Sequence, residues 1–483
     1  MSRINTNIAA INAVRNLARN QDDLKIRLHR LSTGLRINRG ADDPAGLIVS
    51  ERLRSDIRGI HQAIENSGRA SNVVSTTEGA LNEVSALLLD LQALVTAAAN
   101  EAGLTNDEVR ANQQQVDSIL NSLDRISNTT EFAGKKLLNG SEAYLTSGVP
   151  PNAIAAMRLF GIQLPQAGSR ELTIRVTQSA QTAQLALIGT NAIGPSTLSA
   201  TTISIKGTLG NELLSFAAGT TLAQVRIAIN AATAVTGVSA VVSAAGVAGV
   251  ASALLLGSTT LGSDAFVSVE PIGGSFVAAN NSGLALRGEG VDAGVLVNGR
   301  VASVRGLRAD VRAAGIDARF YLTQSFGQTL SSATFSIIGG GAVFQITPEI
   351  SSAGQIQFGL DAVSTLRLGD PTTGLLYTLR TGGANELASL NHTVIQTIVD
   401  EAIDQVSSIR ARFGNIQRNQ IDPSVASQRV AMENVTASES IIRDADIAVE
   451  VSALTRAQIL VQSTQFTLQI ANSIPNLVLS LLG

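Results

Sequence analysis

The sequence predicts a multi-domain chain whose two ends form an all-α coiled coil and helical bundle, while a β-rich, α+β middle projects outward. Three observations support this fold class. Leucine and isoleucine recur every three or four residues near both ends. Short apolar runs bounded by Gly, Pro or Asn recur between residues 141 and 384. Aromatic residues make up only 3% of the chain, which suits long helices packed through Leu, Ile and Ala.

The first helix is expected from Ile4 to Leu35. A single helix with an apolar stripe is not stable alone, because the stripe stays in water, so this helix needs a partner. The residues that form the stripe at a 3.5-residue rhythm are Ile4, Ile8, Ile11, Leu17, Leu24, Leu28, Leu31 and Leu35.

Two more helices and a hairpin are expected before residue 145. Asp42 and Asp43 suit a helix N-cap in front of Pro44, and the second long helix is expected over residues 44–99. A third helix is expected over residues 107–126. The sequence EFAGKKLLNGSEAYL then predicts a short hairpin, with Gly134 among the residues that supply turn geometry.

The middle of the chain, residues 141–384, is rich in Ala, Gly, Ser, Thr and Val. We expect strands at ELTIRVT, TTISIKG, AFVSVEP, GVLVNGR, ATFSIIG and VFQITPE. One helix is expected over residues 222–233, followed by the strand-like GVSAVVSA, so this part is interpreted as a strand–helix–strand unit. The region is predicted to form one or two α+β domains with antiparallel sheets.

Helices return from about residue 385. A helix is expected over residues 394–417, and Pro423 interrupts or restarts the helical chain. A final helix is expected over residues 424–482 as the missing partner of the first helix. Both apolar stripes reach the chain ends, where residues are normally polar, which indicates burial against other copies. The contact residues expected in the final stripe are Leu454, Val461, Leu468, Ile470, Leu477 and Leu481.

Composition argues against several classes of function. The chain has no cysteine, so disulfides, thiolate nucleophiles and cysteine metal sites are impossible. Its three histidines lie outside the β-rich middle, and no catalytic or phosphate-binding motif is present, so we expect neither enzyme activity nor a cofactor. A net charge of -3 argues against nucleic-acid binding. No secretory signal pattern or membrane-spanning run is recognised, so no membrane insertion is expected.

Arginine greatly outnumbers lysine in the helical ends, and guanidinium groups pair well with carboxylates. Two interpretations stand: these arginines form a solvated charged face, or they pair between subunits and set the register of an assembly. The arginines taken as candidate contacts are Arg52, Arg54, Arg58, Arg110, Arg125, Arg410 and Arg443.

Motifs at both ends are similar to those of bacterial flagellin. At the N-terminal end these are INTNIAAINAVRNL, LSTGLRINRGADDPAGLIVSERLRSDIRGI and STTEGALNEV. At the C-terminal end they are FGNIQ, ENVTASESIIRDADIAVEVSALTRAQILVQSTQFTLQIAN and IPNLVLSLLG. The segment GTTLAQVRIAINAATAVTGVSAVV also resembles an insert of flagellin variable domains. The resemblance covers about residues 1–140 and 390–483.

The resemblance implies a secreted, extracellular filament subunit used for motility, and it divides the chain into layers. Residues 1–43 and 450–483 would form the inner coiled coil, 44–140 and 385–449 the helical shell, and 141–384 the outer domain. It also implies terminal helices that order on assembly. The implied partners are other flagellin copies, a cytosolic export chaperone at about residues 452–483, the flagellar type III export apparatus, and hook-associated and cap proteins.

The sequence departs from the family pattern at two places. Many flagellins carry an Arg-Glu pair in a stretch that an animal innate receptor recognises, and here Gln92 and Ala93 replace that pair before Leu94. The resemblance therefore implies weak receptor recognition. Pro423 lies where the family usually has a continuous helix, which predicts either a kink or a short loop.

Three alternatives remain open from the sequence. A flagellin-like protein of the hook–filament junction shares the helical ends, although the long β-rich middle favours the filament subunit. An enzyme could lie in the middle domain, against which the absence of His and Cys there argues. An adhesive or carbohydrate-binding role of the outer domain is compatible with assembly.

Overall fold

The computed structural model describes residues 6–100, 103–165, 168–188, 200–243, 253–273, 277–280, 283–284, 286–313, 315–389 and 391–480. The chain divides into two compact units, each described by itself below. The first unit comprises Met1–Ala70, Gln345–Ile350 and Arg418–Gly483. The second unit comprises Ser71–Phe344 and Ser351–Gln417.

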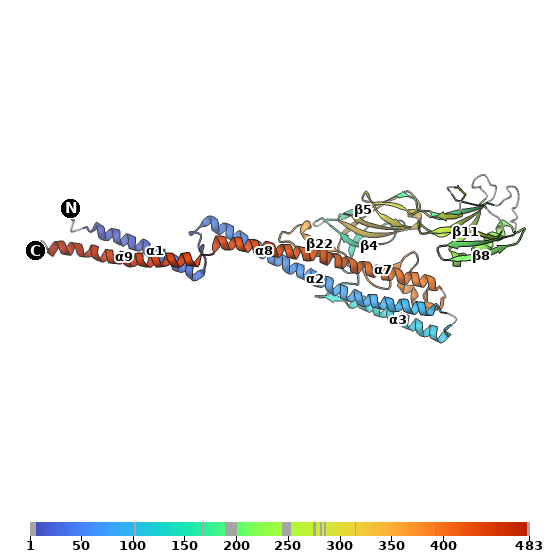
Figure 1. Cartoon of the computed structure of the whole chain (residues 1–483), viewed down its shortest axis with the longest axis horizontal. Helices are drawn as coiled ribbons and strands as arrows, with labels where there is room; N and C mark the ends of the chain where they lie inside the picture. Colours follow the sequence, from blue (N-terminus) through green and yellow to red (C-terminus); the bar gives the residue numbers. More distant parts are fainter. Residues whose placement is uncertain are drawn as a thin grey trace. The chain divides into compact units, whose positions relative to one another are not determined.

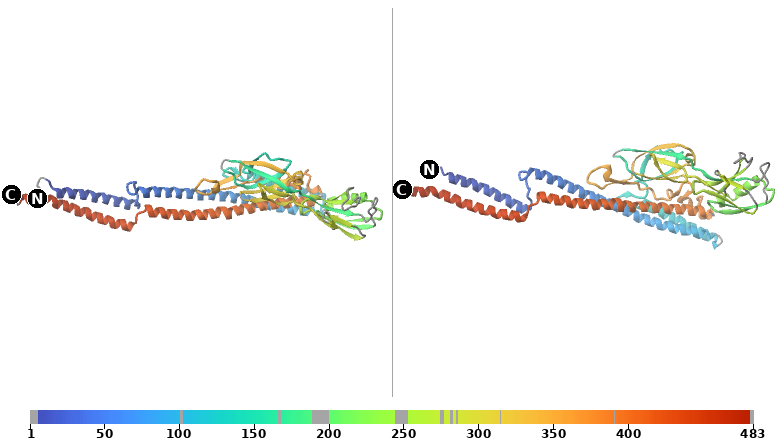
Figure 2. Two further views of the ribbon diagram at one scale, coloured as in Figure 1. Left: turned by 90° about the horizontal axis from the view of Figure 1, so that it is seen from above. Right: turned by 45° about the horizontal axis from the view of Figure 1, so that its top comes forward.

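The first unit is built around two terminal helices, α1 (Ile8–Thr33) and α9 (Ile447–Ser480), which run antiparallel and side by side (Figures 1 and 2). The Asn7 side chain caps α1 by accepting a hydrogen bond from the Ala10 N–H. Gly34 ends α1 with a φ of 70°, a left-handed conformation that favours glycine. The expected pairing of the two chain ends is confirmed.

The predicted single helix over residues 424–482 is wrong, because the structure breaks it into α8 (Asp422–Arg443) and α9. At the break, Asp444 is extended and forms a bridge with Leu35 in the connector after α1. The Asp446 side chain then accepts hydrogen bonds from the Ala448 and Val449 N–H groups at the start of α9. The two connectors thus satisfy each other's backbone groups where both helices stop.

The helix is not interrupted by a loop at Pro423. A π-helical turn, η5 (Gln417–Ile421), leads directly into α8, and Pro423 occupies the first turn of that helix. Proline has no N–H and so removes one donor from the helical ladder, which explains a widened turn at this point.

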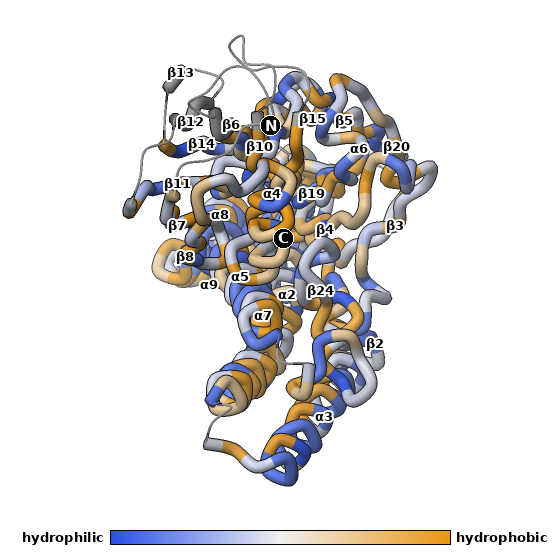
Figure 3. Tube along the Cα trace, turned by 90° about the vertical axis from the view of Figure 1, so that its right-hand side faces the viewer, coloured by the Kyte–Doolittle hydropathy of each residue, from blue (hydrophilic) through white to orange (hydrophobic). Residues whose placement is uncertain are grey.

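The long helices of the second unit match their expected positions. The helix α2 (Pro44–Ala98) begins in the first unit and continues into the second, where α3 (Asn106–Thr129) and α7 (His392–Ile416) run alongside it (Figure 1). Thr105 and Glu108 form a capping box at the start of α3. Hydrophilic and hydrophobic residues alternate along α3 and α7 (Figure 3). The predicted hairpin follows as β1 (Glu131–Phe132) and β2 (Lys135–Lys136).

Among the described helices, α2 alone is long and apolar enough to meet a length and composition test for a membrane span. The core helix of a soluble protein passes the same test. Several of its apolar side chains, including Leu81, Leu88 and Leu91, are completely buried within the second unit.

The first sandwich of the second unit packs two antiparallel sheets on one apolar core that includes Leu172, Ile174 and Phe320. The strand orders are β16-β15-β5-β20-β3 and β17-β18-β19-β4. The strands are β3 (Tyr144–Ser147), β4 (Ile154–Ile162), β5 (Arg170–Gln178), β15 (Gly294–Val297), β16 (Arg300–Val301), β17 (Ser303–Arg305), β18 (Arg308–Ala313), β19 (Ile316–Leu322) and β20 (Ser332–Gly340), and the short helix α6 (Gln324–Gly327) follows β19.

The second sandwich has a separate core that includes Leu185, Ile205 and Val267. Its strand orders are β13-β12-β6-β10-β9 and β14-β11-β7-β8, and the expected strand–helix–strand unit is confirmed as β8, α4 and β9. The elements are β6 (Thr182–Ile188), β7 (Thr201–Gly207), β8 (Asn211–Phe216), α4 (Leu222–Ala231), α5 (Thr233–Thr236), β9 (Val238–Ser243), β10 (Ala253–Leu261), β11 (Phe266–Gly273), β12 (Val277–Asn280), β13 (Gly283–Leu284) and β14 (Arg287–Glu289).

Shorter elements connect the first sandwich to α7. The six runs expected to be strands all contain one, and the pairings recorded among them are antiparallel, as predicted. The connecting elements are β21 (Ala342–Gln345), η2 (Ser352–Gly354), β22 (Gln355–Phe358), β23 (Gly369–Asp370), β24 (Gly374–Leu375), η3 (Leu376–Leu379) and η4 (Leu387–Ser389).

Candidate assembly interface

The contact between α1 and α9 is a heptad seam, as the 3.5-residue rhythm predicts, but part of it is formed by a different row of residues. Ala13 on α1 is 5% exposed, and Ala457 and Val461 are its buried counterparts on α9. The inward-facing residues are spaced three and four apart, as in a coiled coil. The seam consists of Ala10, Ala13, Leu17, Asn20, Leu24, Arg27 and Leu31 on α1 and Glu450, Leu454, Ala457, Val461, Thr464, Leu468 and Ala471 on α9.

Four expected contact residues lie off this seam. Ile8, Ile11 and Leu28 on α1 are 57%, 59% and 48% exposed, and Ile470 on α9 is 51% exposed. Their placement in the seam with α9 was wrong, because the heptad register turns the row of Ala10, Ala13 and Leu17 toward α9 instead. Leu35 is half-buried in the connector after α1. Leu477 belongs to α9, whereas Ile4 and Leu481 lie outside the described residues.

Polar side chains fix the register of the two helices. Asn7 Nδ2 donates to the Ala471 carbonyl at 2.7 Å, and Asn20 Nδ2 donates to Thr464 Oγ1 at 2.7 Å. A polar pair at a seam position costs stability in any other register, so it specifies one alignment.

A buried carboxylate sits at the other end of the seam. Glu450 is only 5% exposed, and both Arg27 and Arg30 reach it with nitrogen–oxygen distances of 3.1 Å. The hydrogen bond that Arg27 donates to Glu450 is the largest factor that raises the pKa of Arg27 above its ordinary value. Sequence reasoning missed Glu450 because it considered only the apolar members of the stripe.

Large apolar side chains remain in solvent on both terminal helices after they pack together. Large apolar side chains left in solvent in such number are typical of an interaction site. The exposed residues are Ile8, Ile11, Val14, Ile26 and Leu28 on α1 and Ile447, Val449, Val451, Ile459, Leu460, Phe466, Ile470 and Ile474 on α9.

The candidate arginine contacts fall into two groups. Glu51 forms ion pairs with Arg54 on the same helix, at 2.9 Å, and with Arg443 of α8, at 3.1 Å. Arg110 pairs with Asp107 one turn earlier on α3, at 3.2 Å. These pairings lie within the chain. Arg52, Arg58 and Arg125 are exposed, and Arg410 is half-buried.

The stretch of Gln92, Ala93 and Leu94 lies on the part of α2 that belongs to the second unit. Gln92 Nε2 donates to Asp400 Oδ1 on α7 at 2.6 Å, whereas the Ala93 side chain is exposed and Leu94 is half-buried. The residue that replaces the family arginine therefore links two helices of the second unit.

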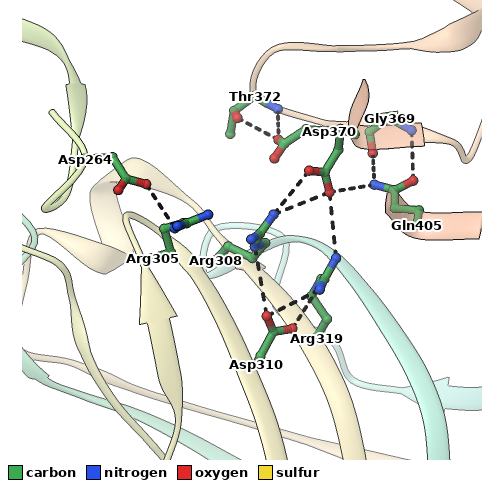
Figure 4. A network of polar contacts seen from close by, with 10 residues as sticks. Asp264, Arg305, Arg308, Asp310, Arg319, Gly369, Asp370, Thr372 and Gln405 are labelled. Carbon is green, nitrogen blue, oxygen red and sulfur yellow. Dashed lines mark hydrogen bonds and ion pairs between the residues drawn. The ribbon is translucent and has the colours of Figure 1, made fainter. Parts of the chain in front are cut away.

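A charged sheet face that the sequence analysis missed lies on the first sandwich. The strand register aligns Asp310 of β18, Arg319 of β19 and Arg158 of β4 in one row. Arg319 Nε lies 2.6 Å from Asp310 Oδ1 (Figure 4). Alternation of charged residues along β18 and β19 could have revealed this face. The residues outside the two strands that pair with it are far away in the sequence and could not have been found in this way.

Glu401 of α7 connects that helix to the charged face. Its carboxylate lies 3.2 Å from Arg308 Nη1 and 3.7 Å from Arg319 Nη1. Gln405 donates to Glu401 at 3.0 Å. It also donates to the Gly369 carbonyl at 2.7 Å (Figure 4). The sandwich is thus joined to α7 by paired charges.

Arg412 of α7 strengthens the same contact. Its Nε lies 3.3 Å from Asp317 Oδ2, and its guanidinium carbon lies 3.2 Å from the centre of the Phe160 ring. Burial lowers the pKa of Arg412 to about 10, and the Asp317 carboxylate opposes this shift. Aromatic stacking and an ion pair hold the same side chain.

Replacement of Glu401 by Ala is expected to destabilise the second unit by about 3 kcal/mol, because two partly buried arginines lose their shared carboxylate. Urea unfolding followed by far-UV circular dichroism measures the change. Glu270→Ala is the matched control, since Glu270 pairs with Lys206 on the exposed surface and such pairs contribute about 1 kcal/mol or less. Equal midpoints for the two variants would contradict the assignment.

The described residues include no group of three or more His, Asp or Glu side chains that could hold a metal ion. The two chain ends combine into one helical unit that leaves large apolar side chains exposed, which is the arrangement of a structural protein that assembles with other copies. The class is therefore that of self-assembling proteins with helical ends.

Comparison with known proteins identifies the family. The family model of the bacterial flagellin N-terminal helical region matches residues 4–143, and that of the C-terminal helical region matches residues 396–482. The flagellin hook IN motif matches residues 202–253. The chain belongs to the bacterial flagellin family and is a structural subunit of the flagellar filament.

Individual flagellin sequences agree with the family models. A flagellin from Salmonella choleraesuis is 30% identical over 99% of both chains. A flagellin from Clostridium tyrobutyricum is 34% identical over 44% of this chain and 55% of that protein. Among solved structures, a flagellar hook-associated protein from Legionella pneumophila is 13% identical, with a TM-score of 0.30 over 80% of this chain and 97% of that one. The junction-protein alternative is not favoured by the full-length flagellin matches.

Proposed function

We propose that this flagellin polymerises through α1 and α9, which bury their remaining apolar faces against neighbouring copies. The observation that carries the proposal is that Ile8, Ile11 and Phe466 stay exposed after the two helices pair. Each such side chain contributes about 1.5 to 3 kcal/mol when it becomes fully buried. A head-to-tail contact that does not close generates a helical filament.

The two connectors at residues 34–43 and 444–446 support a division of the chain into layers. In this proposal, residues 1–43 and 450–483 form the inner coiled coil, 44–140 and 385–449 the shell, and 141–384 the outer domain. The arginine contacts of the shell, including Arg443 with Glu51, keep subunits rigid as they assemble.

Family membership supports the proposed partners. The chain leaves the cell through the flagellar type III apparatus, and a chaperone covers about residues 452–483 until export. Exposed Ile459, Leu460 and Phe466 give that chaperone an apolar surface to bind. Hook-associated and cap proteins contact the two ends of the filament.

Electron microscopy of the purified protein after polymerisation tests the proposal. Long helical filaments are expected, and the same protein should dominate filaments sheared from cells. Short assemblies that stop at a fixed size would instead support a junction role. Failure to polymerise under every salt and seed condition would contradict the filament assignment.

Weak activation of the animal flagellin receptor is expected, because Gln92 and Ala93 replace the Arg-Glu pair of the family stretch. Loss of a hot-spot arginine costs at least about 2 kcal/mol, which corresponds to roughly 30-fold in affinity. A reporter assay with the purified monomer measures the effect. Gln92→Arg with Ala93→Glu should increase signalling, whereas strong signalling by the unchanged protein would refute the prediction.

A further inference from the structure

The second unit contains a cavity of about 730 Å³ that the filament function does not use. It lies between the segment after the hairpin, strand β4 and the loop before β23. Its lining combines apolar side chains, such as Met157 and Leu366, with the charged groups of Arg158, Asp361 and Arg367. A volume in this range and a mainly apolar lining with a few polar groups are typical of small-molecule sites.

Asp361 is fixed at the cavity by its neighbours in the chain. The Leu360 N–H donates to the Glu142 carbonyl at 3.1 Å, and the Val363 N–H donates to the Leu138 carbonyl at 2.9 Å. Leu360 and Val363 are both fully buried. The backbone on both sides of Asp361 is therefore held in place, and Asp361 is half-buried in the lining of the cavity.

The Asp361 carboxylate lacks a partner that a buried charge normally has. Its Oδ2 atom is shielded from solvent and accepts no hydrogen bond within the described part of the chain. Burial raises the pKa of Asp361 to about 6, although the positive charges of Arg158, Arg367 and Arg412 oppose the shift. Leaving a buried polar oxygen without a partner is unfavourable.

Arg158 is the complementary group. It aligns with Arg319 on the neighbouring strand. Arg319 forms ion pairs with Asp310 and Glu401. Arg158, in contrast, donates a hydrogen bond to the Arg367 carbonyl and forms no ion pair within the described residues. Burial lowers the pKa of Arg158. A cation and an anion thus line one cavity without touching each other.

We infer that this cavity binds a small zwitterion, an α-amino acid, whose carboxylate pairs with Arg158 and whose ammonium group pairs with Asp361. A ligand with only a carboxylate or only an ammonium group would leave Asp361 or Arg158 unpaired. A zwitterion supplies a partner for both side chains at once. The apolar lining around Met157 and Leu366 suits an uncharged side chain. The inference is independent of filament assembly, because every group that carries it lies in the second unit.

Calorimetric titration of the full-length monomer at pH 7.5 with L-leucine and glycine tests the inference. 4-Methylpentanoate, which lacks the ammonium group, and 3-methylbutylamine, which lacks the carboxylate, are matched analogues of leucine. At least one amino acid should bind with a Kd of about 1 mM or below, and both analogues should bind at least tenfold more weakly. Binding should weaken below about pH 6, where protonation of Asp361 removes its charge.

Two variants and a control locate the site. Asp361→Asn and Arg158→Met should each weaken binding at least tenfold, while Arg175→Met, an exposed arginine of β5 outside the cavity, should leave it unchanged. Circular dichroism verifies folding, and Asp361→Asn keeps the shape of the side chain. No binding of either amino acid at 10-fold the expected Kd of about 1 mM, equal binding of 4-methylpentanoate, or unchanged binding by both variants would overturn the inference.

Discussion

Deletion of residues 1–35 abolishes filament formation and leaves the second unit folded. The deletion removes α1, and with it the partner of α9 and the exposed row that includes Ile8, Ile11 and Leu28. The second unit keeps its own apolar cores, so its unfolding should not change. Electron microscopy scores the filaments, and thermal unfolding followed by circular dichroism reports on the sheets.

Two further variants test whether the exposed apolar side chains of α1 are needed for assembly, or only the helix itself. Ile11→Asn with Leu28→Asn keeps α1 and its seam but removes two exposed apolar groups, so filament yield should fall steeply. Leu213→Asn is the matched control, because Leu213 is also exposed but belongs to β8 in the second sandwich. Filaments that still form after the deletion of residues 1–35 would disprove the proposed interface.

Replacement of Glu450 by Ala lowers the melting temperature of assembled filaments more than any other single change in the seam. Glu450 is buried and serves both Arg27 and Arg30, so its loss leaves two guanidinium groups without their carboxylate. Breaking a buried pair in this way costs about 3 to 5 kcal/mol per subunit. Scanning calorimetry of the filaments measures the shift.

Two further variants make the Glu450 result specific. Glu450→Gln keeps an acceptor for the arginines and should fall between the wild type and the alanine variant. Asp22→Ala is the control, because Asp22 pairs with Lys25 on the solvent side of α1, where both side chains are more than 70% exposed. A melting temperature unchanged by Glu450→Ala would show that apolar packing alone sets the register.

Most helices could be predicted from the sequence because their signals are local. Periodic apolar residues and the position of Pro44 predicted α2, α3 and α7 within a few residues. The break at Asp444 could not be predicted in this way. Its extended backbone is matched by a bridge to Leu35, more than 400 residues earlier in the chain.

The side chains that enter the seam between α1 and α9 could not be predicted from local sequence signals either. The sequence offers α1 a row of isoleucines and a row of alanines, and both fit a helical repeat. The choice of the row with Ala13 depends on hydrogen bonds from Asn7 and Asn20 to α9, which only the folded pair reveals. The charged face with Arg319 and the distant Glu401 was missed for a similar reason.

The sequence by itself determined that both ends are helical and apolar, that the middle is antiparallel β-structure, and that the motifs resemble flagellin. These properties follow from short-range periodicity and composition. Tertiary structure alone decided which apolar row faces inward, where the C-terminal helix breaks, and that Arg158 and Asp361 line one cavity. Each of these depends on the free energy of contacts between residues far apart in the chain, which local pattern does not encode.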